Sequence, residues 1–248
     1  MVKKIGKVLL PVVFWGVVWQ MAAAAVGKEL LLPGPGLVLG RLVELAGTAV
    51  FWQTAGATLM RVFGGLLAGV ALGAGLAGCT FAVPVLDWVL SPAVKLIRAT
   101  PVASFILLLW LWVETGKVPG VISCLMVLPV VWGNVVKGLA ETDPQLLELA
   151  GAYGFGRWKT VRLVYVPSAL PYFANGCRTA LGLAWKAGVA AEALCLPKAA
   201  IGTQVYFSKL YLETADLFAW TLVVVGLSFL LEWGVGAGIK NYELRRKN

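Results

Sequence analysis

Three ionisable residues, Arg178, Lys186 and Glu192, lie within one long apolar stretch in the second half of the chain. A charged side chain that moves from water into lipid is costly, so each of the three is a candidate for a functional site. On a translocation pathway, the two cations could bind an anionic or acid-bearing solute. A structural or interfacial role is the alternative for each residue.

Helical spacing limits what these side chains can reach. From a helix start near Pro171, a rise of about 1.5 Å per residue places Arg178, Lys186 and Glu192 roughly 10, 22 and 32 Å along the axis. Arg178 and Lys186 are then about 80° apart around the helix and can share one broad face. Glu192 lies about 120° from Lys186, which disfavours an ion pair between them. Its place near the outer interface would let its carboxylate extend to water.

Residues on which most enzymes and metal sites depend are scarce in this sequence. Histidine is absent, and Cys79, Cys124, Cys177 and Cys195 lie in or beside apolar runs without a CxxC spacing. Such cysteines are expected to pack as small apolar residues. We therefore expect no catalytic residue, no metal and no other cofactor. An intramembrane enzyme would need a nucleophile and a base at depth, and neither is evident.

Glycine-rich motifs do not indicate a nucleotide site. The stretch GAGLAG from Gly73 matches the dinucleotide pattern, but it lies inside an apolar run with no preceding strand. Gly65, Gly69 and Gly73 recur every four residues, which predicts a smooth helix face for close packing. No phosphate-binding G-x-x-x-x-G-K-[ST] sequence occurs, and TGKV from Thr115 lacks both the first glycine and the hydroxyl residue. Any ATP used by this system would bind to another subunit.

Composition indicates a polytopic membrane protein. The chain is 60% hydrophobic, contains 11 tryptophans and has a mean hydropathy of +0.85. About 20 apolar residues cross the hydrocarbon core as a helix, because lipid offers no partner to a free backbone N–H. We therefore predict an all-α fold with about six transmembrane helices. The predicted spans are roughly Val8–Val26, Val62–Phe81, Thr100–Val113, Val118–Val136, Leu170–Leu196 and Leu217–Val235.

The distribution of lysine and arginine predicts the orientation. With a cytoplasmic N-terminus, inner segments carry 13 of the 21 basic residues and outer segments carry 5, while the acidic residues divide evenly. This count assigns Lys95 and Arg98 to a cytoplasmic segment. The asymmetry follows the positive-inside rule and predicts a multi-pass protein of the cell (inner) membrane with both termini cytoplasmic. Topology thus accounts for the net charge of +9, and no nucleic-acid partner is expected.

One polar segment interrupts the apolar chain between the fourth and fifth predicted spans. The stretch ELAGAYGFGRWKTVRLVYVP begins at Glu148 and ends at Pro167. Its spacing predicts two short cytoplasmic helices, with a corner at Gly154 and Gly156 and with Pro167 ending the second helix. The corner is expected to need either positive φ at Gly154 or a very close approach of a docking partner, and glycine suits both. Such a structure could dock onto a partner, and a folded loop without a partner is the alternative.

These residues resemble a known family. Glu148, Ala150, Gly154 and the VYVP that ends at Pro167 are similar to the E-A-A-x-x-x-G-x9-I-x-L-P signature of permease subunits of binding-protein-dependent ABC importers. Leu149 departs from the first alanine of the pattern. Stretches such as TLMRVFGGLLAGVALG, IRATPVASFILLLWL and CRTALGLAWKAGVAAEAL resemble the nitrate/sulfonate/taurine-type permeases. The resemblance extends from about residue 58 to residue 233.

The resemblance implies a permease that dimerises, receives solute from an extracytoplasmic binding protein and is driven by separate ATPase subunits. It assigns ATPase docking to Glu148, Ala150 and Gly154, which would form a coupling helix. It also implies a division into an N-terminal helix with an extracytoplasmic segment (1–57), a permease core (58–235) and a basic cytoplasmic tail (236–248). A secondary transporter is the rival class, but such proteins often show inverted repeats and intramembrane carboxylates, whereas Glu192 and Glu232 both lie near span ends.

The charge asymmetry leads to a prediction about topology. A single cysteine at Lys159 or Arg246 should resist membrane-impermeant thiol reagents in intact cells, whereas a cysteine at Glu44 should react. Ready labelling at Lys159 from outside would contradict the predicted orientation.

Overall fold

The computed structural model describes residues 2–247, and every regular element within that range is helical. The elements are α1 (Val2–Val26), α2 (Pro35–Ala46), α3 (Ala49–Ala82), α4 (Pro84–Ala99), α5 (Val102–Trp110), α6 (Val118–Ala140), α7 (Pro144–Ala152), α8 (Arg157–Thr160), the π-helical turn η1 (Val161–Tyr165), α9 (Val166–Cys195), α10 (Ile201–Leu210) and α11 (Thr214–Lys247). The predicted all-α class is confirmed.

Three helices are long and apolar enough to cross a membrane, namely α3, α6 and residues 214–237 of α11. The bent pair α4 and α5 would make a fourth span if it crosses as one unit. The first predicted span falls on α1, whose described apolar part is Leu10–Val26, and the fifth falls on α9. The six predicted spans therefore all correspond to helices, although not all of them pass this test of length and composition.

The third predicted span, Thr100–Val113, contains only helix α5. This helix has nine residues, or about 14 Å, which is too short to cross the hydrocarbon core alone. The chain bends by 104° between α4 and α5. Thr100 adopts an extended conformation (φ −79°, ψ 132°) because Pro101 follows it, and a residue before proline is disfavoured in the α region.

The predicted domain boundaries do not separate structural units. Residues 57 and 58 both lie inside α3, which begins at Ala49 because Thr48 caps it by accepting a hydrogen bond from the Phe51 N–H (3.3 Å). The predicted tail continues α11 as far as Lys247, and residue 248 lies outside the described range.

Close backbone contact between α3 and α6 organises the centre of the molecule. A Cβ atom built on Gly65 would lie 2.1 Å from the Gly120 carbonyl oxygen, and one on Gly69 would lie 2.7 Å from that of Cys124. Gly73 makes the same kind of approach one turn further on. The predicted packing face of glycines is therefore confirmed.

The long helix α9 completes this core by packing on both α3 and α6. A Cβ on Gly188 would lie 2.6 Å from a Val62 methyl group and 2.7 Å from the Ser123 hydroxyl. Ser123 is fully buried and donates a hydrogen bond to the Ala184 carbonyl (3.1 Å). Trp185 fills the neighbouring space and donates to the Val224 carbonyl of α11 (3.1 Å). Helices α3, α6 and α9 thus form the core, and α11 packs against α9.

An ion pair fastens α2 to the start of α11. The Arg41 guanidinium of α2 contacts the Asp216 carboxylate, with 3.1 Å between Nη2 and Oδ2, and also pairs with Glu44 (2.7 Å). Hydrogen bonds to Asp216, and then to Glu44, raise the pKa of Arg41 further above its already high value, so this contact stays charged at any physiological pH.

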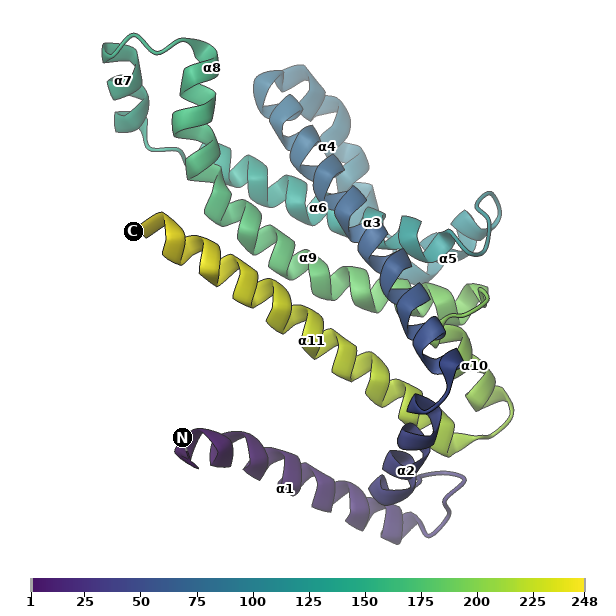
Figure 1. The fold of residues 1–248 in the computed structure, drawn as a ribbon. Coiled ribbons are helices and arrows are strands. Elements are labelled where there is room, and N and C mark those ends of the chain that lie inside the picture. The colour runs from purple at the N-terminus through teal and green to yellow at the C-terminus, as the bar shows by residue number, and fades with distance from the viewer. Residues whose placement is uncertain (1, 248) are drawn as a thin grey trace.

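The N-terminal end of α1 and the C-terminal end of α11 lie on the same side of the molecule as α7 and α8 (Figure 1). On the opposite side lie α10 and the connection from α5 to α6 (Figure 1). This placement agrees with the predicted topology, in which the two termini and the polar segment share one side of the membrane.

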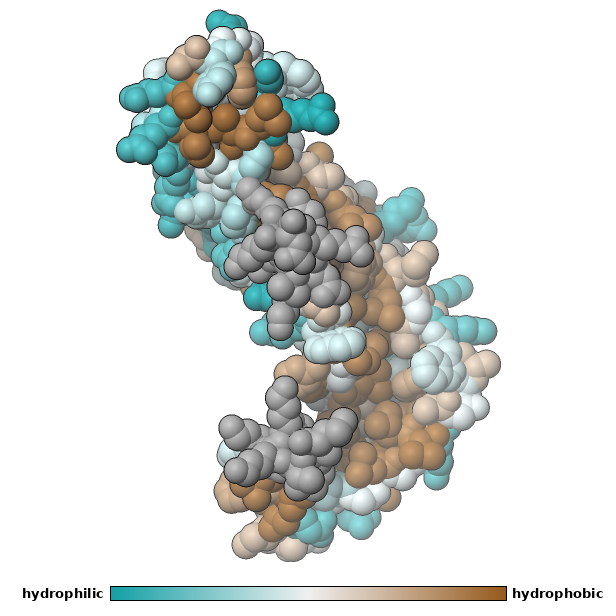
Figure 2. All heavy atoms as spheres, turned by 60° about the vertical axis from the view of Figure 1, so that its left-hand side comes forward, coloured by the Kyte–Doolittle hydropathy of each residue, from teal (hydrophilic) through white to brown (hydrophobic). Residues whose placement is uncertain are grey.

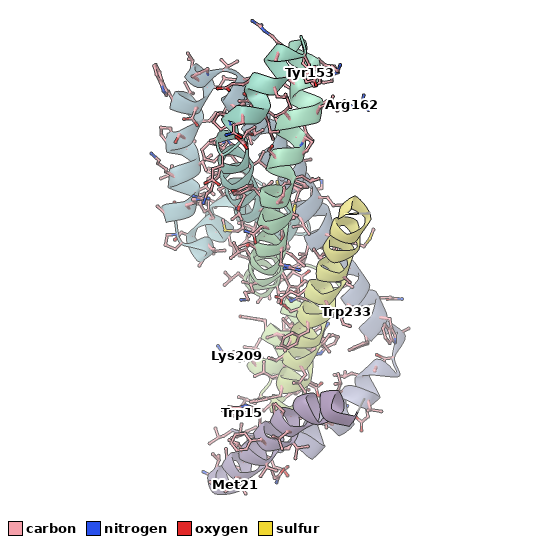
Figure 3. The ribbon with its side chains drawn as sticks, turned by 90° about the vertical axis from the view of Figure 1, so that its left-hand side faces the viewer. Trp15, Met21, Tyr153, Arg162, Lys209 and Trp233 are labelled. Atoms are coloured by element: carbon pink, nitrogen blue, oxygen red, sulfur yellow. The ribbon has the colours of Figure 1, made fainter. Side chains whose placement is uncertain are left out.

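Helix α1 stands apart from the core. Trp19, near its C-terminal end, stacks on Phe218 (5.8 Å between ring centroids) and donates a hydrogen bond to the Pro33 carbonyl (3.1 Å). Trp15 and Met21 of α1 are 66% and 67% exposed (Figure 3). Such a surface suits a helix whose surroundings are lipid or another subunit.

The α3–α6 contact leads to a prediction with an internal control. Gly65→Ala should destabilise the protein by about 1–3 kcal/mol or more, because its methyl group would overlap the Gly120 carbonyl. Gly64→Ala has nothing within 4 Å of its new methyl group and should be neutral or slightly stabilising. Thermal unfolding of the detergent-purified variants measures both effects, and equal unfolding midpoints would refute the close-packed face.

Candidate functional site

Helix α7 is defined at both ends by its own sequence. Pro144 occupies the first turn, and the Asp143 carboxylate caps the helix by accepting a hydrogen bond from the Gln145 N–H (2.9 Å). Helix α7 ends at Ala152, and the chain reverses at Gly154, which has φ +64°.

The end of α7 is a Schellman motif. The Phe155 N–H donates to the Ala150 carbonyl (2.9 Å), and the Gly154 N–H donates to the Gly151 carbonyl (2.9 Å). This pattern requires a left-handed residue at position 154, which glycine adopts without a steric cost. Of the two alternatives expected at Gly154, the positive φ is therefore confirmed.

The three predicted docking residues have different environments. Ala150 is buried (4% exposed), whereas Glu148 is exposed and lies in the second turn of α7. Asp143 caps the N-terminus of α7, and Glu148 lies one turn further along the helix. The Glu148 carboxylate makes no ion pair within the described chain, so it is free to meet a partner.

An apolar hollow of about 290 Å³ lies between α7 and the start of the following helix. It is lined by Leu146, Leu149, Ala150, Tyr153, Phe155, Leu163 and Val164. Apolar surface ringed by hydrophilic side chains occupies the upper end of the molecule, where α7 and α8 lie (Figure 2). Tyr153 and Arg162 lie at the same end (Figure 3). An apolar centre with a charged rim is typical of a protein-binding surface.

The second arm of the polar segment is not a separate short helix. Helical backbone begins at Arg157 and runs through η1 into α9 without a break. The prediction that Pro167 ends this arm is wrong. A π turn, in which the Val166 N–H bonds to the Val161 carbonyl, widens the helix just before the proline. Such a turn relieves the clash that proline makes with the preceding turn, so the helix continues. The second arm of the polar segment is thus part of one continuous helix with α9.

Glu192 occupies a buried polar network and has no exposed surface. One carboxylate oxygen, Oε2, accepts hydrogen bonds from the Thr58 hydroxyl (2.9 Å) and the Gly202 N–H (3.2 Å). The other, Oε1, pairs with the Arg61 guanidinium (3.3 Å). The expectation that this carboxylate extends to water is wrong, because α3 and α10 cover it and supply its partners.

Arg61 ties the same network to the loop between α9 and α10. Its guanidinium donates to the carbonyls of Lys198 (2.8 Å) and Ala199 (2.9 Å). The Thr58 hydroxyl also accepts from the Ile201 N–H (3.0 Å). Sequence analysis missed this role of Arg61 because its partners lie more than 130 positions away, and the three-residue spacing of Thr58 and Arg61 on one helix face was the available signal.

Arg178 and Lys186 are both exposed on α9. Arg178 lines a hollow of about 540 Å³ together with Glu232 and Trp233 of α11, and Lys186 does not line it. The structure therefore does not gather Arg178, Lys186 and Glu192 into one site. Arg178 and Lys186 are exposed at different places on α9, whereas Glu192 is a buried carboxylate.

Arg98 departs from its predicted surroundings. Its guanidinium donates to the Pro129 carbonyl (2.8 Å), which lies within the predicted span Val118–Val136. Sequence analysis predicts a cytoplasmic segment for this side chain, but α4 packs against α6 and places it beside the middle of that helix. Within the described residues, no group of three or more histidine, cysteine or acidic side chains could hold a metal ion.

These features define a class: a helical membrane protein whose close-packed core carries an exposed helical hairpin. The hairpin consists of α7, the turn at Gly154 and α8. Residues 65–237 match the family described as "Binding-protein-dependent transport system inner membrane component". This match covers more than half of the chain, and the protein belongs to this family of permease subunits of ABC importers.

Similar proteins support the same assignment. The taurine transport system permease protein TauC of Escherichia coli K12 is 28% identical over 88% of this chain and 82% of its own length. The riboflavin transport system permease protein RibX of Chloroflexus aurantiacus is 29% identical over 87% of this chain and 84% of its own.

Solved structures share the fold. An amino acid ABC transporter chain aligns with a TM-score of 0.61 at 18% identity, covering 76% of this chain and 90% of that chain. The MetNI methionine ABC transporter, in an inward-facing conformation, aligns with a TM-score of 0.60 at 20% identity, covering 77% and 93%.

The buried network leads to a stability prediction. Arg61→Met should leave the Glu192 carboxylate buried without its cation and should cost about 3–5 kcal/mol, or roughly 6–20 °C in the unfolding midpoint. Lys117→Met is the matched control, because its pair with Glu114 is 73% and 72% exposed and should contribute at most about 1 kcal/mol. Similar midpoints for the two purified variants would show that the network does not hold α3, α9 and α10 together.

Proposed function

We propose that this chain forms the membrane pathway of an ATP-driven importer, receives a small solute from an extracytoplasmic binding protein, and couples to a separate ATPase through Glu148–Gly154. The observation that carries the proposal is the α7 hairpin, whose predicted signature residues form a capped helix ending in a Schellman turn at Gly154. The family match and the relatives' names support the importer class.

The hairpin has the properties of a docking element. Ala150 packs inward, Glu148 points to solvent, and the apolar hollow beside them has a charged rim. The Glu148 carboxylate can pair with a basic residue of the ATPase. Because the second arm is continuous with α9, a displacement of the hairpin would be passed directly to that helix. We propose that ATPase closure moves two such hairpins and rocks the helices between inward-open and outward-open states.

The same surfaces favour a dimer of permease subunits. The two cations of α9 and the apolar side chains of α1 are exposed in the single chain. Pairing two copies around α9 would place Arg178 and Lys186 on a shared pathway. The cations favour a solute with an acidic group.

The proposed orientation puts both termini and the hairpin in the cytoplasm. It rests on the excess of basic residues in these segments and on their shared side of the fold (Figure 1). The side chains of the predicted basic tail beyond residue 237 lie outside the described ones.

The coupling role makes Gly154 the most informative position to change. Gly154→Val would force a β-branched residue to φ +64°, at a cost of about 1–2 kcal/mol or more, and would distort the end of α7. We expect the variant to insert normally but to lose most of its ATPase subunit on purification. Glu148→Ala should weaken recovery of the ATPase more mildly.

Gly156→Val is the control for added bulk in the same hairpin, because position 156 has φ −68° and nothing within 4 Å of a new Cβ. Complex recovery and solute-stimulated ATP hydrolysis in liposomes are the measurements. Normal values for Gly154→Val would mean that the hairpin does not couple the two subunits.

A further inference from the structure

Two opposite charges on facing helices share one hollow. Arg178 of α9 and Glu232 of α11 both line the cavity of about 540 Å³, with Thr179, Phe229 and Trp233 around them. Both charged side chains are exposed to this space. We propose that Arg178 and Glu232 form a binding station for a small zwitterionic solute, with the acidic group of the solute at Arg178 and its amino group at Glu232.

Each charge lies over a glycine of the opposite helix. A Cβ built on Gly236 of α11 would lie 3.2 Å from Arg178 Nη2, and one on Gly182 of α9 would lie 3.6 Å from Glu232 Oε1. The absence of a side chain at both positions leaves room for the two charged groups to reach into the space between the helices.

The two glycine contacts also set how far the charges are offset along the helix axes. Arg178 faces Gly236 and Glu232 faces Gly182, so the two helices run antiparallel here and the charges are offset by four residues. Four residues correspond to about 6 Å along a helix. This offset suits a solute whose acidic and amino groups are a few bonds apart.

Neither charge is neutralised by the described part of the chain. The ion pairs there join other residues, and no nitrogen of Arg178 lies within 4.0 Å of a Glu232 oxygen. Both charges lie inside predicted spans, Glu232 near the end of its span, and unpaired charges there are costly unless water or a ligand meets both of them. A purely anionic solute would satisfy Arg178 but would be repelled by Glu232.

The aromatic lining agrees with an amino group on the solute. Phe229 and Trp233 are 68% and 74% exposed, and both border the hollow on the side of Glu232. An ammonium group is attracted to the face of such rings. The carboxylate and the two rings therefore form the cation-binding half of the station.

This proposal rests on the importer function and names the solute class that the pathway accepts. It makes Glu232 a specificity-determining residue, because the carboxylate distinguishes aminated from non-aminated acids. The competing explanation is a bridge within the protein, in which the two charges serve only to hold α9 and α11 at their spacing.

The test is ATP-dependent uptake by the full complex in liposomes, with ATPase and binding protein present. The probe is a defined mixture of short carboxylates, sulfonates and phosphonates, each with and without a terminal amino group, together with the matching amines. Mass spectrometry of the liposome lumen gives the uptake of every component. We expect aminated acids to enter at least 10-fold faster than their non-aminated counterparts.

Variants then assign the two halves of the station. Glu232→Gln should lower the ratio of aminated to non-aminated uptake about 10-fold, whereas Arg178→Gln should lower uptake of all acid-bearing probes. Lys95→Gln, which removes an exposed cation of α4 outside the hollow, should change neither quantity.

Two results would overturn the station. One is uptake restricted to non-aminated acids, or an unchanged ratio in Glu232→Gln. The other is an equal loss for all probes in each single variant with recovery in Arg178→Gln/Glu232→Gln, which is the behaviour of a structural bridge. Failure of the unaltered complex to import any probe with ATP would instead count against the proposed importer function.

Discussion

The close approach of α6 to α3 and α9 is the constraint on which the rest of the structure depends. In lipid the hydrophobic effect does not drive helices together, so contact area and hydrogen bonds must hold them. Gly65, Gly69 and Gly188 allow that contact because a Cβ at any of them would overlap the neighbouring helix. The Arg61–Glu192 network then fixes one end of the packed unit by joining α3, α9 and α10.

This rigid core explains how a small hairpin could control a large helix. The chain leaves α6, forms α7 and reverses at Gly154, and from Arg157 it continues as unbroken helix through η1 into α9. Both arms of the hairpin are therefore attached to core helices. The exposed cations of α9 lie on the same continuous helix, so docking at one end and solute binding further along are mechanically connected in the proposed importer.

Sequence reasoning succeeded where local chemistry decides the outcome. The four-residue repeat of glycines predicted the α3 packing face, and the signature around Gly154 predicted a left-handed turn. It failed where distant partners decide. The environment of Glu192 depends on Arg61 and on α10, which no spacing along α9 reveals. The position of Arg98 depends on the packing of α4 against α6, and the continuity past Pro167 depends on a π turn that hydropathy does not report.

Site-specific photo-crosslinking tests the central claim most directly. A benzoylphenylalanine in place of Leu149, which is 53% exposed on α7, should cross-link to the ATPase subunit in the assembled complex. The same group in place of Trp112, which is 78% exposed beyond α5 on the opposite side of the fold, should not. An intact complex that shows no ATPase adduct at position 149, or an ATPase adduct at position 112, would contradict the assignment of the α7 hairpin as the coupling element.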